Sequence, residues 1–232
     1  MYIELKEGVK SYGSGENTVF ALDHVNFSLE KGKICVVLGP SGSGKSTLLN
    51  VLGGLDSLDG GSLAVDGVQV NTLTKKQLTE YRKNSVGFVF QFYNLIPDLT
   101  VKENLRVVSD ISKSPIAVND VLAALEIEKY ADRFPRELSG GQQQRAAIAR
   151  AVVKNPSLLL CDELTGALDT ASSLNVLKYI EKVNSIYGAT TVIITHNEAI
   201  ADMADVIVRL RDGKVVSRTE NSAKKSAAEL VL

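Results

Sequence analysis

A glycine-rich loop between an apolar run and a helical pattern decides which folds are open to this chain. The loop reads Gly39-Pro40-Ser41-Gly42-Ser43-Gly44-Lys45-Ser46 and matches the pattern G-x-x-x-x-G-K-[S/T]. The apolar run Lys33–Leu38 before it predicts a buried strand, and Lys45–Leu52 predicts a helix. Because glycines let several backbone N–H groups point into one hollow at the start of a helix, the loop predicts a phosphate site. Lys45 is expected on the β- and γ-phosphates of a nucleotide, and the Ser46 hydroxyl on Mg²⁺.

Apolar β-rich runs alternate with helical patterns along the rest of the chain, which predicts an α/β fold with a largely parallel, buried sheet. The N-terminal third reads mostly as strands, and Asp66-Gly67 is a hairpin turn signal within Leu63–Val70. Long β-branched runs are absent between about residues 92 and 140, which predicts a helical insert. We expect residues 1–232 to form a single domain whose last dozen residues are a frayed helix. The other expected strands and helices are Ile3–Tyr12, Val19–Leu29, Val118–Leu125, Gly140–Lys154, Leu158–Cys161, Ser172–Tyr187, Thr190–Thr195, Val206–Leu210 and Lys214–Ser217.

Charge and hydropathy exclude several functional classes. The chain has 26 Lys and Arg against 27 Asp and Glu, a net charge of −1, so no general attraction to nucleic acid is expected. Its longest apolar stretches are far shorter than the roughly 18 residues of a membrane span, and its first residues do not resemble a signal peptide. The two cysteines, Cys35 and Cys161, lie in apolar runs, which favours buried free thiols in a reducing cytosol over a disulfide.

An acidic element lies downstream, where the apolar run Leu158–Cys161 is followed by Asp162 and Glu163. A strand that ends in two carboxylates places them at the carboxyl edge of the sheet, where α/β proteins bind ligands. Asp162 is suited to hold the Mg²⁺ shell through water, and Glu163 is suited to polarise an attacking water. Strand ends often carry acidic residues, so this element indicates a nucleotide site only in combination with the phosphate loop upstream.

The segment Leu138-Ser139-Gly140-Gly141-Gln142 resembles the signature of the ATP-binding-cassette (ABC) ATPases, and further motifs of that family occur in the expected order. Tyr12 resembles the aromatic residue that stacks on adenine. Gln91 resembles the glutamine that senses Mg²⁺ and the γ-phosphate, and Ala167-Leu168-Asp169 resembles the D-loop. His196, directly after a predicted strand, resembles the switch histidine that holds the γ-phosphate and the attacking water.

The resemblance implies a P-loop NTPase core of the ABC ATPase type, with a mainly parallel sheet, an N-terminal antiparallel β subdomain and an inserted helical subdomain. It implies ATP and Mg²⁺ as ligands and ATP hydrolysis as the reaction, with Glu163, His196 and Lys45 as catalytic residues. The residues that it implies for magnesium are Ser46, Gln91 and Asp162. The nucleotide-binding residues that it implies are Tyr12, Gly39, Pro40, Ser41, Gly42, Ser43, Gly44, Lys45, Ser46, Thr47, Gln91, Ser139, Gly141, Gln142 and Asp169.

By the same resemblance, the signature completes the nucleotide site of a second copy of the chain, head to tail, so that a two-fold dimer holds two ATP molecules. Opening and closing of this dimer is expected to drive membrane permease subunits, since the chain has no predicted span of its own. The insert is expected to contact the permease, with Tyr93–Pro97 nearest the coupling surface. The protein is therefore expected in the cytoplasm, peripheral to the inner face of the cell membrane.

Three finer features resemble one branch of the family, that of lipoprotein release, macrolide export and peptide-antibiotic resistance. They are the long Ser-Gly-rich loop Tyr12–Phe20, the run Phe92–Asn104, and Gln143-Gln144-Arg145 after the signature. The branch implies export or extrusion of a lipoprotein, peptide or antibiotic. It also implies permeases of the FtsX and MacB kind, which have few membrane helices and large extracytoplasmic domains.

One residue departs from the family pattern, because Leu164 stands where a proline usually follows the catalytic glutamate. Proline holds the residue before it in an extended conformation. We therefore expect a more loosely held Glu163 and slower hydrolysis, and we expect Leu164→Pro to preserve or raise the rate.

Several alternatives stay open or are disfavoured. The sequence does not separate a transporter subunit from an ABC ATPase that drives a membrane partner mechanically, as in cell division. A soluble P-loop kinase has no use for the signature, and the neutral charge disfavours a nucleic-acid-associated ATPase. Among single residues, His24 is interpreted as structural, and Phe20 either shares the adenine contact or packs. Gln144 lies in a run that could be a solvated helix face.

Overall fold

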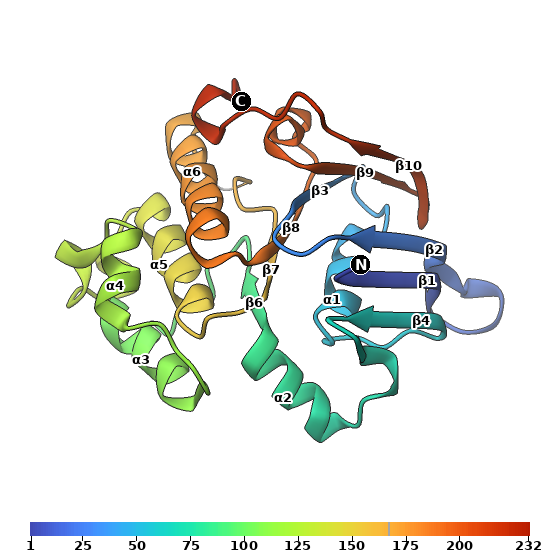
Figure 1. Cartoon of the computed structure of the whole chain (residues 1–232), viewed down its shortest axis with the longest axis horizontal. Helices are drawn as coiled ribbons and strands as arrows, with labels where there is room; N and C mark the ends of the chain where they lie inside the picture. Colours follow the sequence, from blue (N-terminus) through green and yellow to red (C-terminus); the bar gives the residue numbers. More distant parts are fainter. Residues whose placement is uncertain (167) are drawn as a thin grey trace.

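The computed structural model describes residues 1–166 and 168–232, which form two sheets with helices between and beside them (Figure 1). Four strands form the smaller sheet, in the order β2-β1-β4-β5, and its neighbouring strands are all antiparallel. These strands are β1 (Ile3–Tyr12), β2 (Val19–Leu29), β4 (Gly60–Val65) and β5 (Val68–Gln69). The predicted N-terminal antiparallel subdomain is therefore present.

Six strands form the larger sheet, in the order β10-β9-β3-β8-β7-β6. Their bounds are β3 (Ile34–Leu38), β6 (Val86–Val89), β7 (Leu158–Asp162), β8 (Thr190–Thr195), β9 (Val206–Arg211) and β10 (Lys214–Glu220). Neighbouring strands are parallel except for β9 and β10, which form the predicted hairpin. Because parallel strands end at the same edge of a sheet, the segments that follow β3, β6, β7 and β8 lie near one another.

Helices cover both faces of the larger sheet. They are α1 (Lys45–Leu52), α2 (Lys75–Ser85), α3 (Val101–Ile111), α4 (Val118–Ala124), α5 (Gly140–Val152) and α6 (Thr170–Tyr187). The stretch expected as a helical insert contains α3 and α4, and it leads into α5 (Figure 1). Gly188 ends α6 in the predicted way, with a left-handed φ of 67°. Within residues 1–166 and 168–232, no helix has both the length and the apolar composition needed to cross a bilayer.

The side chains of β3 alternate between two cores. Ile34, Val36 and Leu38 pack into a core formed with α3, α5 and α6. Cys35 and Val37 pack into the other core, formed with α1 and the antiparallel sheet. An uninterrupted apolar strand is what a sheet that is covered on both faces requires. Cys35 and Cys161 are buried free thiols, as predicted, and burial raises the pKa of each.

Two elements, α2 and β6, were not among the predicted ones. A capping box begins α2, because the N–H groups of Thr74 and Gln77 each donate to the other residue's side chain. This S/T-x-x-Q pattern is present in the sequence and could have revealed the helix. β6 consists of only Val86–Val89, which is too short to give a periodic signal.

The prediction of a frayed helix at the C-terminus is wrong. A short 3₁₀ turn over Ala227–Glu229 packs against α6, and Ala227 and Leu230 are buried. The Ala227 N–H and the Ser226 hydroxyl both donate to the Glu181 carboxylate on α6. Tertiary contacts therefore order a tail whose Lys- and Ser-rich composition indicates fraying.

Candidate nucleotide-binding and hydrolysis site

The phosphate loop joins the end of β3 to the start of α1, as predicted. Gly42 and Gly44 have left-handed φ values of 78° and 100°, which non-glycine residues rarely adopt. A Cβ atom on Gly44 would also lie 2.2 Å from the Ala21 carbonyl oxygen, so no larger residue fits there. The loop is therefore shaped by the backbone of β2 as well as by its own sequence.

Lys45 lies inside the loop rather than on the surface. It is 7% exposed, and its ammonium group donates to the carbonyl oxygens of Gly39 at 2.7 Å and of Pro40 at 2.9 Å. An ammonium group has three N–H donors, so one remains for a phosphate oxygen. The Ser43 hydroxyl is buried and has no hydrogen-bond partner among the described residues. Buried donors without a partner fit a loop that binds an anion.

A cavity of about 440 Å³ opens beside the loop. Tyr12 and Glu163 line it, together with Ser46 and Thr47 in the first turn of α1. The Tyr12 hydroxyl donates to Asp56 at 2.7 Å, which fixes its ring, and the Lys10 ammonium lies 5.4 Å from the centre of that ring. Neither of these two partners of Tyr12 was predicted, and the contact with Asp56 joins residues 44 positions apart along the chain.

The two carboxylates follow β7 at the carboxyl edge of the larger sheet. Burial raises the pKa of Asp162, and the neighbouring charge of Glu163 raises it further, while Lys45 acts in the opposite direction. Glu163 has a left-handed φ of 45°, and its N–H donates to the Ile194 carbonyl oxygen at 3.0 Å. A non-glycine residue in this conformation costs on the order of 1 kcal/mol or more and points to a functional constraint.

Glu163 is held by two residues at the end of β8. Nδ1 of His196 lies 3.2 Å from Oε1 and 3.1 Å from Oε2 of the carboxylate, and the Thr195 hydroxyl donates to Oε2 at 3.4 Å. The His196 ring is mostly exposed, whereas the Glu163 side chain is only 18% exposed. The predicted pair is therefore brought together, and Thr195 is an additional member that its place at a strand end could have indicated.

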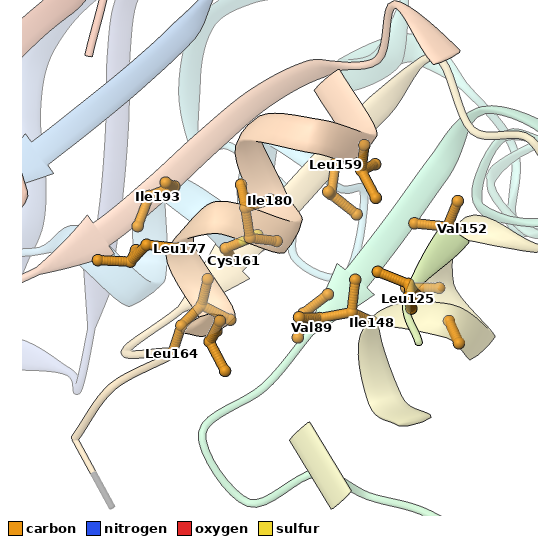
Figure 2. Packing of buried hydrophobic residues seen from close by; sticks show 14 of the residues in the cluster. Val89, Leu125, Ile148, Val152, Leu159, Cys161, Leu164, Leu177, Ile180 and Ile193 are labelled. Carbon is orange, nitrogen blue, oxygen red and sulfur yellow. The ribbon is translucent and has the colours of Figure 1, made fainter. Parts of the chain in front are cut away.

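Leu164, which stands where the family pattern has a proline, is buried in the core. It is 3% exposed, and Figure 2 shows it in the cluster that also holds Leu177, Val89 and Ile148. A proline at this position would favour an extended conformation at Glu163, but Glu163 has a left-handed φ of 45°. Leu164 leaves this conformation open, and slower hydrolysis stays a prediction.

Gln91 follows β6 and lies against the segment that carries Glu163. A Cβ atom on Gly166 would be 2.9 Å from the Gln91 amide nitrogen. Gly166 in turn donates its N–H to the Glu163 carbonyl oxygen at 3.1 Å. The sensing glutamine predicted from the sequence therefore contacts the turn that follows the two carboxylates.

The residues predicted for Mg²⁺ supply only oxygen ligands, namely the Ser46 hydroxyl, the Gln91 amide oxygen and the Asp162 carboxylate. Magnesium prefers oxygen ligands and is usually held by one or two carboxylates together with the substrate phosphates. Across the described residues, no group of three or more His, Cys, Asp or Glu side chains could hold a metal ion by itself. This donor set fits a magnesium ion that arrives with a nucleotide.

The signature residues do not line the cavity beside the phosphate loop of their own chain. Ser139 precedes α5, and its N–H donates to Oε1 of Gln142 at 2.9 Å. Asp169 begins α6, where hydrogen bonds from the Ser172 N–H and hydroxyl lower its pKa. The described residues that line the cavity do not include Ser139, Gly141, Gln142 or Asp169. Ala167 of the predicted D-loop lies outside the described residues.

Gln144, His24 and Phe20 are not among the described residues that line the cavity. Gln144 is fully buried, and its amide has no partner among the described residues. The interpretation of this run as a solvated helix face is therefore wrong at Gln144. His24 is exposed and lies 2.7 Å from the Asp23 carboxylate, on which it acts by lowering the pKa. Phe20 is 52% exposed and does not pack into either core.

A phosphate loop at the carboxyl edge of a mainly parallel sheet, with carboxylates at the end of a nearby strand, defines a P-loop nucleotide-binding protein. Comparison with known proteins identifies the family of P-loop proteins to which the chain belongs. Residues 22–166 match the family described as ABC transporter. A bacitracin export ATP-binding protein, BceA, from Halalkalibacterium halodurans is 39% identical, over 90% of this chain and 85% of that protein. A solved dimer of the ATP-binding cassette MJ0796 with ADP and Pi has a TM-score of 0.85 and 37% identity, over 94% of this chain and 98% of that chain.

The chain therefore belongs to the ABC transporter family. This confirms the family, the fold class and the ATP-binding, ATPase class that the sequence predicts. A putative ABC transporter ATP-binding protein of Mycoplasma pneumoniae is 41% identical over 98% of this chain, but over only 50% of its own length. The chain thus spans about half of that relative.

Proposed function

We propose that this chain is the ATP-hydrolysing subunit of a membrane transporter and that it works as a head-to-tail dimer around two Mg-ATP. The observation that carries the proposal is the placement of Glu163. Its carboxylate lines the cavity beside the phosphate loop and is held by His196 and Thr195. A general base must lie within reach of the water that it activates, and this cavity edge is where the terminal phosphate of a bound nucleotide would be.

The phosphate loop binds and orients the nucleotide. Its backbone N–H groups and the N-terminal end of α1 attract the phosphates, and Lys45 places a positive charge beside them. Tyr12 offers a ring for the base: the Lys10 ammonium lies on it, and 44% of the residue is exposed for stacking. The cavity therefore has a base end near β1 and a phosphate end near the larger sheet.

Glu163 acts as the general base in this proposal, and His196 positions it. The carboxylate takes a proton from the attacking water, while the imidazole holds the carboxylate and faces the same edge. Ser46, Gln91 and Asp162 would hold Mg²⁺. When bound, that ion neutralises charge on the β- and γ-phosphates.

A second copy of the chain supplies the signature. The N-terminus of α5 would attract an anion by its first-turn N–H groups and helix dipole, yet it does not line the cavity of its own chain. Pairing two chains head to tail would place each signature on the phosphates held by the other. The dimeric form of the 37% identical cassette with ADP and Pi supports this arrangement.

Membrane permeases of the FtsX and MacB kind are the proposed partners, and the protein would then lie in the cytoplasm, at the inner face of the cell membrane. Phe92 and Ile96 expose apolar side chains beside Gln91. The Tyr93 carbonyl oxygen accepts a hydrogen bond from Arg150 on α5, and its hydroxyl lies against Gly140. A partner that presses on this segment would therefore act on both Gln91 and the signature helix.

Export or extrusion of a lipoprotein, peptide or antibiotic is the proposed task. The bacitracin-export name of the BceA relative supports transport over the mechanical, cell-division type of action. Copurification tests the partner: the tagged chain, expressed with the permease encoded beside it, should be recovered from membranes and lost from them when that permease is deleted. Recovery from membranes without any permease would contradict the proposal.

Phosphate release by the purified chain tests the enzymatic part. We expect hydrolysis of Mg-ATP that stops when Mg²⁺ is chelated and returns when the ion is restored. Hydrolysis at the full rate without Mg²⁺ would contradict the assigned site, as would transfer of the γ-phosphate to a second substrate.

A further inference from the structure

The side chain of Gln142, in the first turn of α5, has both ends of its amide committed within the chain. Oε1 accepts the Ser139 N–H at 2.9 Å, and Nε2 donates to the Tyr130 hydroxyl at 2.9 Å. The Ser139 N–H can only donate and therefore specifies which end of the amide faces it, while the Tyr130 hydroxyl anchors the other end. A flipped amide would place two donors, the NH₂ group and the Ser139 N–H, against each other.

Tyr130 is itself fixed by the helical insert. It ends the short 3₁₀ turn Glu128–Tyr130 after α4, and its half-buried ring packs against the core shared by α3, α5 and α6. Its N–H donates to the Ile127 carbonyl oxygen at 2.9 Å, and its carbonyl oxygen accepts the Arg133 N–H at 3.0 Å. The Tyr130 hydroxyl is thus presented to the signature by a rigid part of the insert.

We propose that Tyr130 is a positioning residue for the signature of this chain. Its hydroxyl holds the Gln142 amide in place, and the amide in turn satisfies the Ser139 N–H and fixes the first turn of α5. The remaining N–H groups of that turn then point outward, at the nucleotide of the second copy. This role rests on the proposed head-to-tail dimer, and it links the insert directly to the residues that would close on the partner's ATP.

The position of Tyr130 predicts an effect on dimerisation that can be separated from ATP binding by the monomer. Tyr130→Phe removes only the hydroxyl, and the phosphate loop of the same chain is not touched. ATP binding to the monomer should therefore be unchanged. A dimer contains two signatures, so losing one neutral hydrogen bond in each should weaken ATP-dependent dimerisation about 5- to 100-fold.

Dimerisation is measured in the Glu163→Gln background, which holds ATP without turning it over. The mass in solution with saturating Mg-ATP is followed against protein concentration, with and without Tyr130→Phe. Tyr179→Phe is the matched control, because Tyr179 is also half-buried and loses a hydroxyl that donates to Glu126 at 2.9 Å and accepts from Arg145, which lies on α5 beyond its first turn. Binding of a fluorescent ATP analogue to the dilute monomer and the melting temperature are recorded for each variant.

We expect Tyr130→Phe, but not Tyr179→Phe, to raise the protein concentration at which the chain dimerises. The affinity of the monomer for the ATP analogue should stay unchanged. In the otherwise wild-type chain, the lowered hydrolysis rate of Tyr130→Phe should be restored by raising the protein concentration, which a folding defect would not allow. Dimerisation equal to that of the parent overturns the role of Tyr130, and so does an equal loss with Tyr179→Phe. If the Glu163→Gln parent itself stays monomeric, the proposed dimer fails, and the role of Tyr130 fails with it.

Discussion

Nδ1 of His196 lies 3.1 Å from the Glu163 carboxylate, although the two residues stand 33 positions apart in the chain. The parallel pairing of β7 with β8 brings them together, because Asp162 lies opposite Ile194 at the ends of these strands. The Glu163 N–H extends that pairing by donating to the Ile194 carbonyl oxygen. The register of the sheet therefore sets the pair and places the proposed base and its proposed positioning group together at one edge.

Lys45→Ala should reduce ATP hydrolysis by about 10²-fold or more, since removing one preorganised donor from developing negative charge typically has this effect. The substitution also leaves the carbonyl oxygens of Gly39 and Pro40 without their partner. Phosphate release at saturating Mg-ATP measures the change. Lys76→Ala, on the exposed side of α2, is the control and should hydrolyse ATP like the wild type. Wild-type activity in Lys45→Ala would contradict the assignment of the phosphate site to this loop.

Leu164→Pro should lower the hydrolysis rate, contrary to the expectation from the family pattern. Glu163 has a φ of 45°, and proline after it favours an extended backbone. Holding a residue in a sparsely populated conformation costs on the order of 1–3 kcal/mol, and proline adds to this cost at Glu163, so a loss of about tenfold is expected.

Leu164→Ala separates this backbone effect from the loss of packing. Removing a buried leucine side chain costs about 2–5 kcal/mol of stability in either variant. The turnover number of the alanine variant should lie between those of the wild type and the proline variant. A proline variant that is folded and as fast as the wild type would show that the conformation of Glu163 does not matter.

Asp162→Asn should raise the stability of the nucleotide-free chain at neutral pH while lowering its activity. The pKa of Asp162 is raised in the folded chain, first by burial and then by Glu163. A raised carboxyl pKa means that the folded state binds the proton more tightly. Stability from this group is therefore present below its ordinary value and is lost as the pH rises through the raised value.

Urea unfolding of the wild type and of Asp162→Asn, followed from the ordinary carboxyl pKa of 3.8 upward to neutral pH, measures this effect. The stability advantage of the asparagine variant should grow as the pH rises and be largest at neutral pH. The Glu198→Gln variant changes a carboxylate whose pKa is lowered by Arg209, so it should shift stability in the opposite direction. An advantage of Asp162→Asn that shrinks as the pH rises would contradict the assigned cause.

Local sequence predicted the parts of the site that each depend on one segment. The phosphate loop has a sequence pattern of its own, and the apolar run before Asp162 forms the buried part of β7. Contacts between distant segments could not be predicted in this way: Tyr12 with Asp56, Gln142 with Tyr130, and the 3₁₀ turn near the C-terminus with Glu181. These contacts join polar groups at separations that carry no periodic signal.

The surroundings of Leu164 could not be predicted for the same reason. The sequence shows which residue has replaced the usual proline, but only the fold shows that its side chain enters the core and that Glu163 is left-handed. Likewise, the three glutamines after Gly141 look alike in sequence. The helix places Gln142 against Tyr130 and buries Gln144 completely.

The role of Glu163 is tested most directly by its glutamine variant. Glutamine nearly keeps the shape of glutamate and can still bind water, but it cannot accept the proton. Loss of a general base typically lowers the rate by about 10²–10⁴. Nucleotide binding by the phosphate loop should survive, and removing one negative charge near the γ-phosphate should favour the closed dimer further.

The decisive measurement is the mass of Glu163→Gln in solution, with Mg-ATP and with Mg-ADP, beside the wild type and Glu198→Gln. Glu198 lies near the same edge but pairs with Arg209, so its variant should behave like the wild type. We expect a dimer only for Glu163→Gln with ATP, a monomer with ADP, and a mostly monomeric wild type in both. Hydrolysis by Glu163→Gln at the wild-type rate, or a monomer at saturating Mg-ATP, would contradict the assignment of Glu163 as the base of an ATP-closed dimer.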